Sequence, residues 1–198
     1  MVTTRMPVLA TERLYIRPFT LDDLDVIHEI LDEASDGGTE EAGSLEARRA
    51  WLHWSVANEQ ELTKLLQPPY GDRAIVRRAD DVLVGACGFV PELKPFGLLP
   101  SFPRAEGDAS LYTPQVGLFW EVGSRFRRNG YATEAAGAMI DYAFRTLRLA
   151  RIVAGTDREN VASMGVMRKL GMRLERNSHP EPSWFQVCGV LENPEQTG

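Results

Sequence analysis

Apolar residues recur along this chain with two different periods, which predicts an α/β protein. Residues 14–19 form a short strand that ends beside a proline, and the apolar residues behind an N-cap at Thr20 recur at helical spacing. The further predicted elements are a helix from Ser44 to Leu62, a hairpin at 72–90, a strand at 116–122, a helix at 131–147, a strand at 151–156, a helix at 160–170 and two closing strands at 172–176 and 184–191. We expect one mixed sheet of six or seven strands.

Residues 91–115 stand apart because they hold five of the twelve prolines together with the large apolar residues Phe96, Leu98, Leu99 and Phe102. Prolines at this density oppose regular secondary structure, yet apolar side chains need cover from water. We therefore expect an ordered Pro-rich insertion that packs on the domain. A disordered loop is the alternative.

Length and composition favour a single globular domain. The 198 residues, 43% of them hydrophobic and 25% charged, are enough to bury a core. No apolar stretch approaches the roughly 20 residues of a membrane span, and the first residues lack the apolar core of a signal peptide, so we expect a cytoplasmic protein that binds no membrane. Cys87 and Cys188 each lie in an apolar run and are expected to be buried free thiols rather than metal ligands.

The net charge of −6 argues against binding of nucleic acid, but the charge is unevenly distributed. Residues 125–176 contain eleven Arg or Lys and five Asp or Glu, whereas residues 29–46 contain seven acids and no base. The basic region is suited to an anion and the acidic run to a cation. Two ordinary solvated surfaces are the alternative.

Candidate chemistry centres on residues 127–132, Arg-Arg-Asn-Gly-Tyr-Ala, between a predicted strand and a predicted helix. A helix start has unpaired N–H groups and the positive end of the helix dipole, which suit a diphosphate. Gly130 lets the backbone approach a phosphate, and Ala132 leaves the helix start uncrowded. The segment matches neither GxGxxG nor the P-loop pattern, so alone it is weak evidence for a phosphate site.

The wider segment 116–135, VGLFWEVGSRFRRNGYATEA, resembles the acetyl-CoA-binding motif of the GNAT superfamily of N-acetyltransferases, R/Q-x-x-G-x-G/A. Two more segments are similar to its RimJ/RimL branch, which acetylates the N-termini of ribosomal proteins: TERLYIRP at 11–18 and TDRENVASMGVMRKLGM at 156–172. The resemblance covers about residues 11–190 of one domain that spans 1–198. It implies a mostly antiparallel mixed sheet with a splayed central parallel pair and about four flanking helices.

The resemblance implies acetyl-CoA as the cosubstrate and no metal. Pantetheine would pair with the backbone at 121–123, and the diphosphate would sit on the N–H groups of 127–133. The cofactor-binding residues that it implies are Val122, Gly123, Arg127, Arg128, Asn129, Gly130, Tyr131, Ala132, Thr133 and Asn160.

Three residues are candidates for catalysis. The tyrosine with which many superfamily members protonate the leaving thiolate is replaced here by Met167, and Ser163 is the expected substitute. A hydroxyl bound to the backbone is the alternative role of Ser163. Glu121 is the acid nearest the presumed reaction centre and is a candidate base, whereas Asn160 would contact the cofactor or hold an ordered water.

The predicted function is direct transfer of an acetyl group from acetyl-CoA to a primary amine. The acidic run 29–46 would face the acceptor entrance, so we expect a cationic acceptor, either a protein N-terminus or a small amine. An aminoglycoside or polyamine is the alternative acceptor. Because the usual tyrosine is absent, an acyl-CoA-binding regulator with weak or no catalysis is the alternative function. The expected partners are acetyl-CoA and the amine acceptor, for a monomer or a homodimer.

Overall fold

The computed structural model describes residues 5–32, 43–68, 70–102, 109–179, 181–183 and 185–196. The chain forms two compact units. The first contains Met1–Gly88 and Trp120–Tyr142, and the second contains Phe89–Phe119 and Ala143–Gly198. Three elements contribute to both units, namely strands β4 (Val82–Lys94) and β5 (Thr113–Val122) and helix α3 (Tyr131–Arg145). The expectation of one domain over the whole chain stays a prediction.

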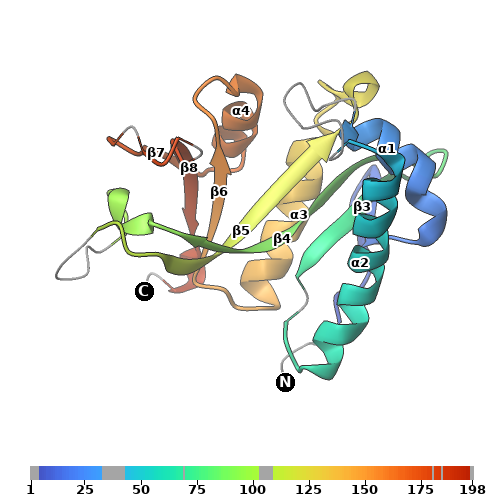
Figure 1. The fold of residues 1–198 in the computed structure, drawn as a ribbon, viewed down its shortest axis with the longest axis horizontal. Coiled ribbons are helices and arrows are strands. Elements are labelled where there is room, and N and C mark those ends of the chain that lie inside the picture. Colours follow the sequence, from blue (N-terminus) through green and yellow to red (C-terminus); the bar gives the residue numbers. More distant parts are fainter. Residues whose placement is uncertain are drawn as a thin grey trace. The chain divides into compact units, whose positions relative to one another are not determined.

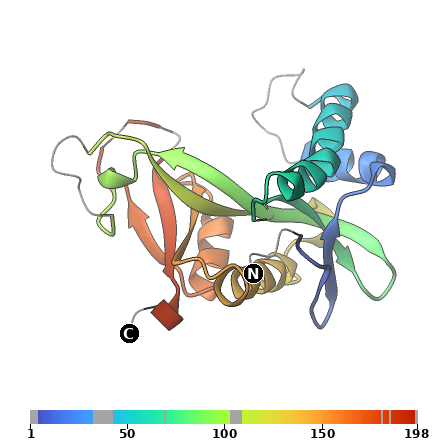
Figure 2. The ribbon, with the colours of Figure 1, turned by 90° about the horizontal axis from the view of Figure 1, so that it is seen from below.

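The first unit places helices on both faces of its strands. Helices α1 and α2 cover one face and α3 covers the other (Figure 1, Figure 2). Apolar side chains from all these layers are buried, among them Ile16, Ile27, Leu52 and Met139. Besides the shared elements, the unit contains β1 (Leu9–Ala10), β2 (Leu14–Pro18), a 3-10 turn (Leu21–Asp23), α1 (Leu24–Asp32), α2 (Leu45–Lys64) and β3 (Gly71–Arg77).

Two predicted caps begin the helices of this unit. The Asp23 carboxylate accepts a hydrogen bond from the Thr20 N–H at 2.8 Å, and Ser44 Oγ accepts one from the Ala47 N–H at 3.1 Å. Each bond satisfies a group that a helix start would otherwise leave open. The predicted starts of both helices are confirmed.

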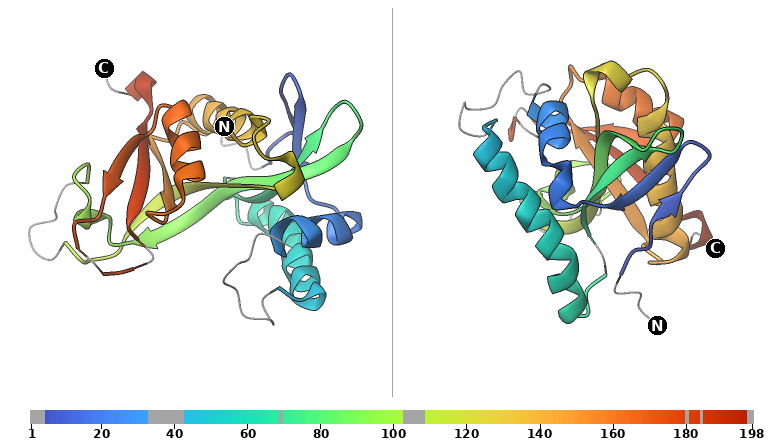
Figure 3. Two further views of the ribbon diagram at one scale, coloured as in Figure 1. Left: turned by 90° about the horizontal axis from the view of Figure 1, so that it is seen from above. Right: turned by 90° about the vertical axis from the view of Figure 1, so that its right-hand side faces the viewer.

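The second unit packs different elements on the two faces of its strands. It contains the 3-10 turn η2 (Phe96–Leu98), β6 (Arg151–Thr156), α4 (Val161–Lys169), β7 (Arg173–Arg176), β8 (Val187–Glu192) and a 3-10 turn at Pro194–Gln196 (Figure 3). Val190 lies in a buried cluster with Phe96 of η2. A Cβ on the adjacent Gly189 would lie 3.1 Å from Met167 Sδ on α4. Because neighbouring strand residues face opposite sides, η2 and α4 cover opposite faces of β8.

Within the described residues, eight strands form one sheet in the order β1-β2-β3-β4-β5-β6-β8-β7. Strands β5 and β6 are parallel, with Gly117 opposite Val153, whereas β2 with β3 and β8 with both β6 and β7 are antiparallel. The predicted mixed α/β sheet is confirmed, but the predicted count of six or seven strands is one or two short. The strand missing from the prediction is β1, whose two residues are too few to show a period.

The Pro-rich segment contains more regular structure than its prolines suggest. Strand β4 continues through Pro91 to Lys94, and β5 begins at Thr113 and includes Pro114. Phe96, Leu99 and Phe102 are buried in one cluster with Phe185, Val153 and other residues of the second unit. The expected ordered packing is therefore present in the described part, but the expectation that prolines exclude regular structure is wrong at both ends of the segment. Residues 103–108 lie outside the described residues.

Candidate functional site

The loop before α3 passes twice through left-handed backbone conformations. Arg128 has a φ of 64° and Gly130 a φ of 81°. The first hydrogen bond within α3 runs from the Glu134 N–H to the Gly130 carbonyl at 3.0 Å. The N–H groups of residues 131–133 precede that bond, so they have no acceptor within the helix. The predicted helix start, with the positive end of its dipole at this loop, is present.

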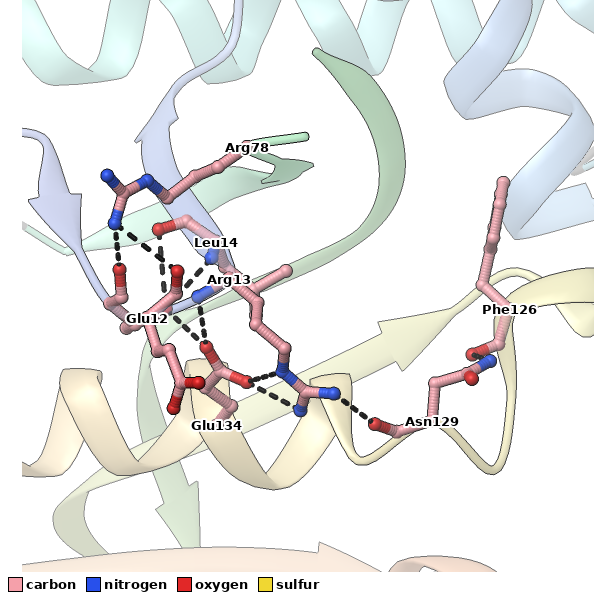
Figure 4. Close-up of polar contacts among 8 residues, drawn as sticks. Glu12, Arg13, Leu14, Arg78, Phe126, Asn129 and Glu134 are labelled. Carbon is pink, nitrogen blue, oxygen red and sulfur yellow. Dashed lines mark hydrogen bonds and ion pairs between the residues drawn. The ribbon is translucent and has the colours of Figure 1, made fainter. Parts of the chain in front are cut away.

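Side chains bind the carbonyl groups of the same loop. Asn129 Nδ2 donates to the carbonyls of Phe126 at 3.1 Å and Arg127 at 3.2 Å. Arg13 Nη1 donates to the carbonyl of Asn129 at 3.0 Å, and Figure 4 shows Arg13 reaching this loop from the segment before β2. Carbonyl oxygens repel an anion and N–H groups attract one, so this bonding favours a site for a negatively charged group.

The predicted base and a predicted phosphate-binding arginine lie in one ion pair. Arg127 Nη2 is 3.1 Å from Glu121 Oε1, and Arg127 Nε donates to the Val122 carbonyl at 3.2 Å. The Gly123 N–H donates to the carbonyl of Val84 at 3.0 Å. The Val122 carbonyl and the Gly123 N–H thus both already form hydrogen bonds within the first unit. A ligand that pairs with the Val122 carbonyl has to share this oxygen with Arg127 or displace Arg127 from it.

The other predicted loop residues differ in exposure. Tyr131 is buried, and the Arg13 guanidinium lies 5.0 Å from the centre of its ring. Arg128 and Asn129 are exposed, whereas Ala132 and Thr133 are half-buried. The part of the loop open to solvent is therefore 127–130, and Tyr131 anchors the start of α3.

Glu134, in the first turn of α3, does more than interact with the helix dipole, because it also binds residues of the segment before β2. Its carboxylate accepts hydrogen bonds from Thr11 Oγ1 at 2.6 Å, the Arg13 N–H at 2.9 Å and Arg13 Nε at 2.7 Å (Figure 4). Partial burial acts to raise the pKa of Glu134, but the bonds from Thr11 and Arg13 outweigh it and hold the pKa below its ordinary value. Glu134 thus ties α3 to the segment before β2.

We expect Glu134 to lose its stabilising effect in acid. Because its pKa is lower in the folded protein than in the unfolded chain, where glutamate titrates near about 4.3, folding favours the ionised form. The contribution is complete above that value and is lost as the pH falls through the folded-state pKa. Urea unfolding of the wild type and of Glu134→Gln should show a clear difference in the free energy of unfolding at pH 7 that shrinks at about pH 3. The same difference at both pH values would contradict this assignment.

In the second unit, Asn160 and Ser163 are brought together at the start of α4. Asn160 Oδ1 caps the helix by accepting a hydrogen bond from the Ser163 N–H at 2.9 Å. Met167, one turn further on, is buried and contacts the position of Gly189. The side chain at the place of the usual tyrosine thus belongs to the core of this unit. Ser163 as the acid stays a prediction.

Arginines pair with two described acids at the beginning of the acidic run. Asp32 lies 2.6 Å from Arg48 and also contacts His28, and Glu29 lies 2.8 Å from Arg125. Arg125, which precedes the loop 127–133 in the chain, therefore already has an acidic partner. Residues 33–42, the middle of the run, lie outside the described residues. The expectation that this run attracts a cation stays a prediction.

Both cysteines are buried free thiols, as predicted. Burial raises the pKa of Cys87 and of Cys188 to about 12, so neither is a thiolate at neutral pH. In the described parts of the chain, no three His, Cys, Asp or Glu side chains are grouped to hold a metal ion. No helix of these parts has both the length and the apolar content that crossing a membrane requires.

Residues 13–173, most of the chain, match the family described as Acetyltransferase (GNAT) domain. The chain belongs to the GNAT family of acetyltransferases. Among its relatives, the uncharacterized N-acetyltransferase YnaD of Bacillus subtilis (strain 168) is 28% identical over 171 residues, which are 84% of this chain and 83% of YnaD.

Solved structures share the GNAT fold of this chain. A GNAT-family acetyltransferase from Bacillus anthracis has a TM-score of 0.66 at 21% identity, covering 94% of this chain and 99% of that one. Ribosomal-protein-S5-alanine acetyltransferase from Vibrio fischeri has a TM-score of 0.66 at 14% identity, covering 98% of this chain and 100% of that one. The predicted family and the predicted enzyme class, an acetyl-CoA-dependent N-acetyltransferase, are confirmed.

We did not single out from the sequence the residues that connect the start of α3 and the preceding loop to the segment before β2. From the sequence, Thr11 and Arg13 were assigned only to a first-strand motif, and Glu134 only to a favourable interaction with the helix dipole. The signal was present, since the segments at 11–18 and 130–135 both resemble motifs of the RimJ/RimL branch. Neither motif by itself, however, predicts that the two are in contact in the folded protein.

Proposed function

We propose that this GNAT enzyme binds the diphosphate of acetyl-CoA on the loop 127–133. The observation that carries the proposal is the turn through Arg128 and Gly130, which presents the amides of the α3 start while its carbonyls are bound elsewhere. A diphosphate placed there accepts hydrogen bonds from several N–H groups and meets the positive end of the helix dipole. Asn160, at the start of α4, is the proposed cofactor contact of the second unit.

Binding in this mode changes the partner of Arg127. The guanidinium leaves Glu121 and the Val122 carbonyl, where it is 3.1 Å and 3.2 Å away, and turns to the diphosphate. Pantetheine then pairs with the freed Val122 carbonyl, as the family resemblance implies. Glu121 loses its cationic partner in the same step and becomes available to accept a proton.

In the proposed reaction, the amine nitrogen attacks the thioester carbonyl and the carbon–sulfur bond breaks. An amine with a pKa near about 10 must first lose a proton at pH 7, at a cost of about 4 kcal/mol, whereas an α-amine near about 8 needs only about 1 kcal/mol. Glu121, directly or through a water, is the proposed acceptor of that proton. Ser163 is the proposed donor of a proton to the leaving thiolate.

The proposed acceptor is a primary amine, either a protein N-terminus or a small cationic amine. One structural neighbour is a ribosomal-protein-S5-alanine acetyltransferase, which supports testing peptide N-termini first. The acidic run 29–46 supports a cationic acceptor, although Glu29 and Asp32 at its beginning are already paired with arginines. Aminoglycosides and polyamines are the alternative acceptors. We also propose a cytoplasmic location, where acetyl-CoA is available.

Thermal unfolding with and without CoA tests the proposed site. A ligand at 100 times its Kd should add about 2.7 kcal/mol to the free energy of unfolding, so we expect a clear rise in Tm at millimolar CoA. No rise in Tm would contradict the binding proposal. A panel of peptides, polyamines and aminoglycosides, with thiol release as the readout, then tests catalysis.

Binding of CoA without thiol release for any amine would favour a second function, that of an acyl-CoA-binding regulator. The observation in its favour is Met167, whose buried side chain supplies no acid at the position of the usual tyrosine. Thiol release with even one amine would exclude a purely regulatory role.

A further inference from the structure

Arg13 contacts the proposed diphosphate loop without belonging to it. Its Nη1 donates to the Asn129 carbonyl at 3.0 Å, and its Nη2 would lie 3.4 Å from a Cβ placed on Gly130. The same guanidinium lies 5.0 Å from the centre of the Tyr131 ring. One side chain thus touches three successive residues of the loop, from the segment that precedes β2.

The bond to Asn129 determines which way one peptide group faces. In a trans peptide, the carbonyl of one residue and the N–H of the next point in opposite directions. The Asn129 carbonyl points toward Arg13, so the Gly130 N–H points away from it. If this peptide were reversed, a carbonyl oxygen would replace a donor at the proposed anion site.

Glu134 orients Arg13, and Arg13 in turn neutralises Glu134. The carboxylate lies 2.7 Å from Arg13 Nε and 2.6 Å from Nη2, which fixes the plane of the guanidinium while Nη1 remains directed at Asn129 (Figure 4). Without a cation beside it, this carboxylate in the first turn of α3 would repel a diphosphate at the same helix start.

We propose that Arg13 is a positioning residue for the diphosphate of acetyl-CoA. It holds the Asn129–Gly130 peptide with its N–H toward the ligand and cancels the charge of Glu134. This inference rests on the proposed function, because it assigns a role in the same loop. Lysine at position 13 would keep the charge beside Glu134 but lacks the fork that reaches Glu134 and Asn129 together.

The test measures the Kd of CoA by calorimetry in the wild type, Arg13→Ala, Arg13→Lys and the control Arg78→Ala. The control substitution removes the same charge nearby, but Arg78 Nη1 donates to the carbonyls of Thr11 and Glu12 and not to the loop. We expect Kd to rise about 10- to 100-fold for Arg13→Ala, less for Arg13→Lys, and less than about twofold for Arg78→Ala. If Arg13→Ala does not fold, Arg13→Lys, which retains the contact with Glu134, carries the test.

A second readout separates positioning from general stability. The amide signal of Gly130 should shift on saturation with CoA in the wild type and in Arg78→Ala, and should lack that shift in the saturated Arg13 variants. If the Arg13 variants had a lowered Tm but bound CoA with the wild-type Kd and showed the same CoA-induced Gly130 shift as the wild type, the positioning role would be overturned and the proposed function left intact. Failure of the wild type to bind CoA would instead overturn the proposed function.

Discussion

Replacing Gly130 with valine is expected to abolish CoA binding while the protein still folds. Gly130 has a φ of 81°, a conformation that costs other residues about 1–2 kcal/mol and β-branched residues more. A Cβ at this position would lie 3.4 Å from Arg13 Nη2, so the valine methyl groups press on the guanidinium that holds the Asn129 carbonyl. Both effects act on the amides proposed to bind the diphosphate. We expect the Kd of CoA to rise by about 100-fold or more.

Gly171→Val is the matched control for this experiment. Gly171 follows α4, has a φ of 78° and would find no atom within 4 Å of an added Cβ. The backbone strain is therefore similar, but the proposed diphosphate loop is unchanged. The control should lose a comparable amount of stability and bind CoA as the wild type does. Equal Kd values for the two variants would show that Gly130 has no special place in the cofactor site.

Replacing Gly85 with alanine is expected to have a large effect on stability. A Cβ on Gly85 would lie 2.2 Å from the carbonyl oxygen of Glu121 and 3.1 Å from the Cα of Val122. Both are backbone atoms, which cannot swing aside as a side chain can. Strands β4 and β5 would have to separate where β5 carries Glu121 and Val122, at a cost of about 3 kcal/mol or more in the free energy of unfolding.

The control for Gly85 is the same substitution at Gly165. An added Cβ there would have no atom within 4 Å, and the residue lies in the interior of α4. Alanine in place of a helical glycine should stabilise the protein by about 0.5–1 kcal/mol. Urea unfolding of both variants measures the contrast. A Gly85→Ala protein as stable as the wild type would show that the two strands do not need this close approach.

The local elements of this protein could be predicted from its sequence because each leaves a short-range signal. The caps at Thr20 and Ser44 lie immediately before periodic apolar residues, and the turn through Asp81 separates two apolar strands. The loop 127–133 before α3, the proposed diphosphate site, could be predicted in the same way, since glycine, arginines and a helix start are neighbours along the chain. The full extent of β4 and β5 could not be predicted, because strand pairing outweighs the local preference of Pro91 and Pro114 against regular structure.

The sequence by itself determined the family, the enzyme class and the position of the loop, all through residues that are close together in the chain. Only the tertiary structure decided what those residues touch. It paired Glu121 with Arg127, buried Met167 beside Gly189, and placed Arg13 between Glu134 and Asn129, more than a hundred residues away in the chain. The physical reason is that such contacts depend on how strands and helices pack, and each motif on its own contains no information about the residues that it meets across the fold.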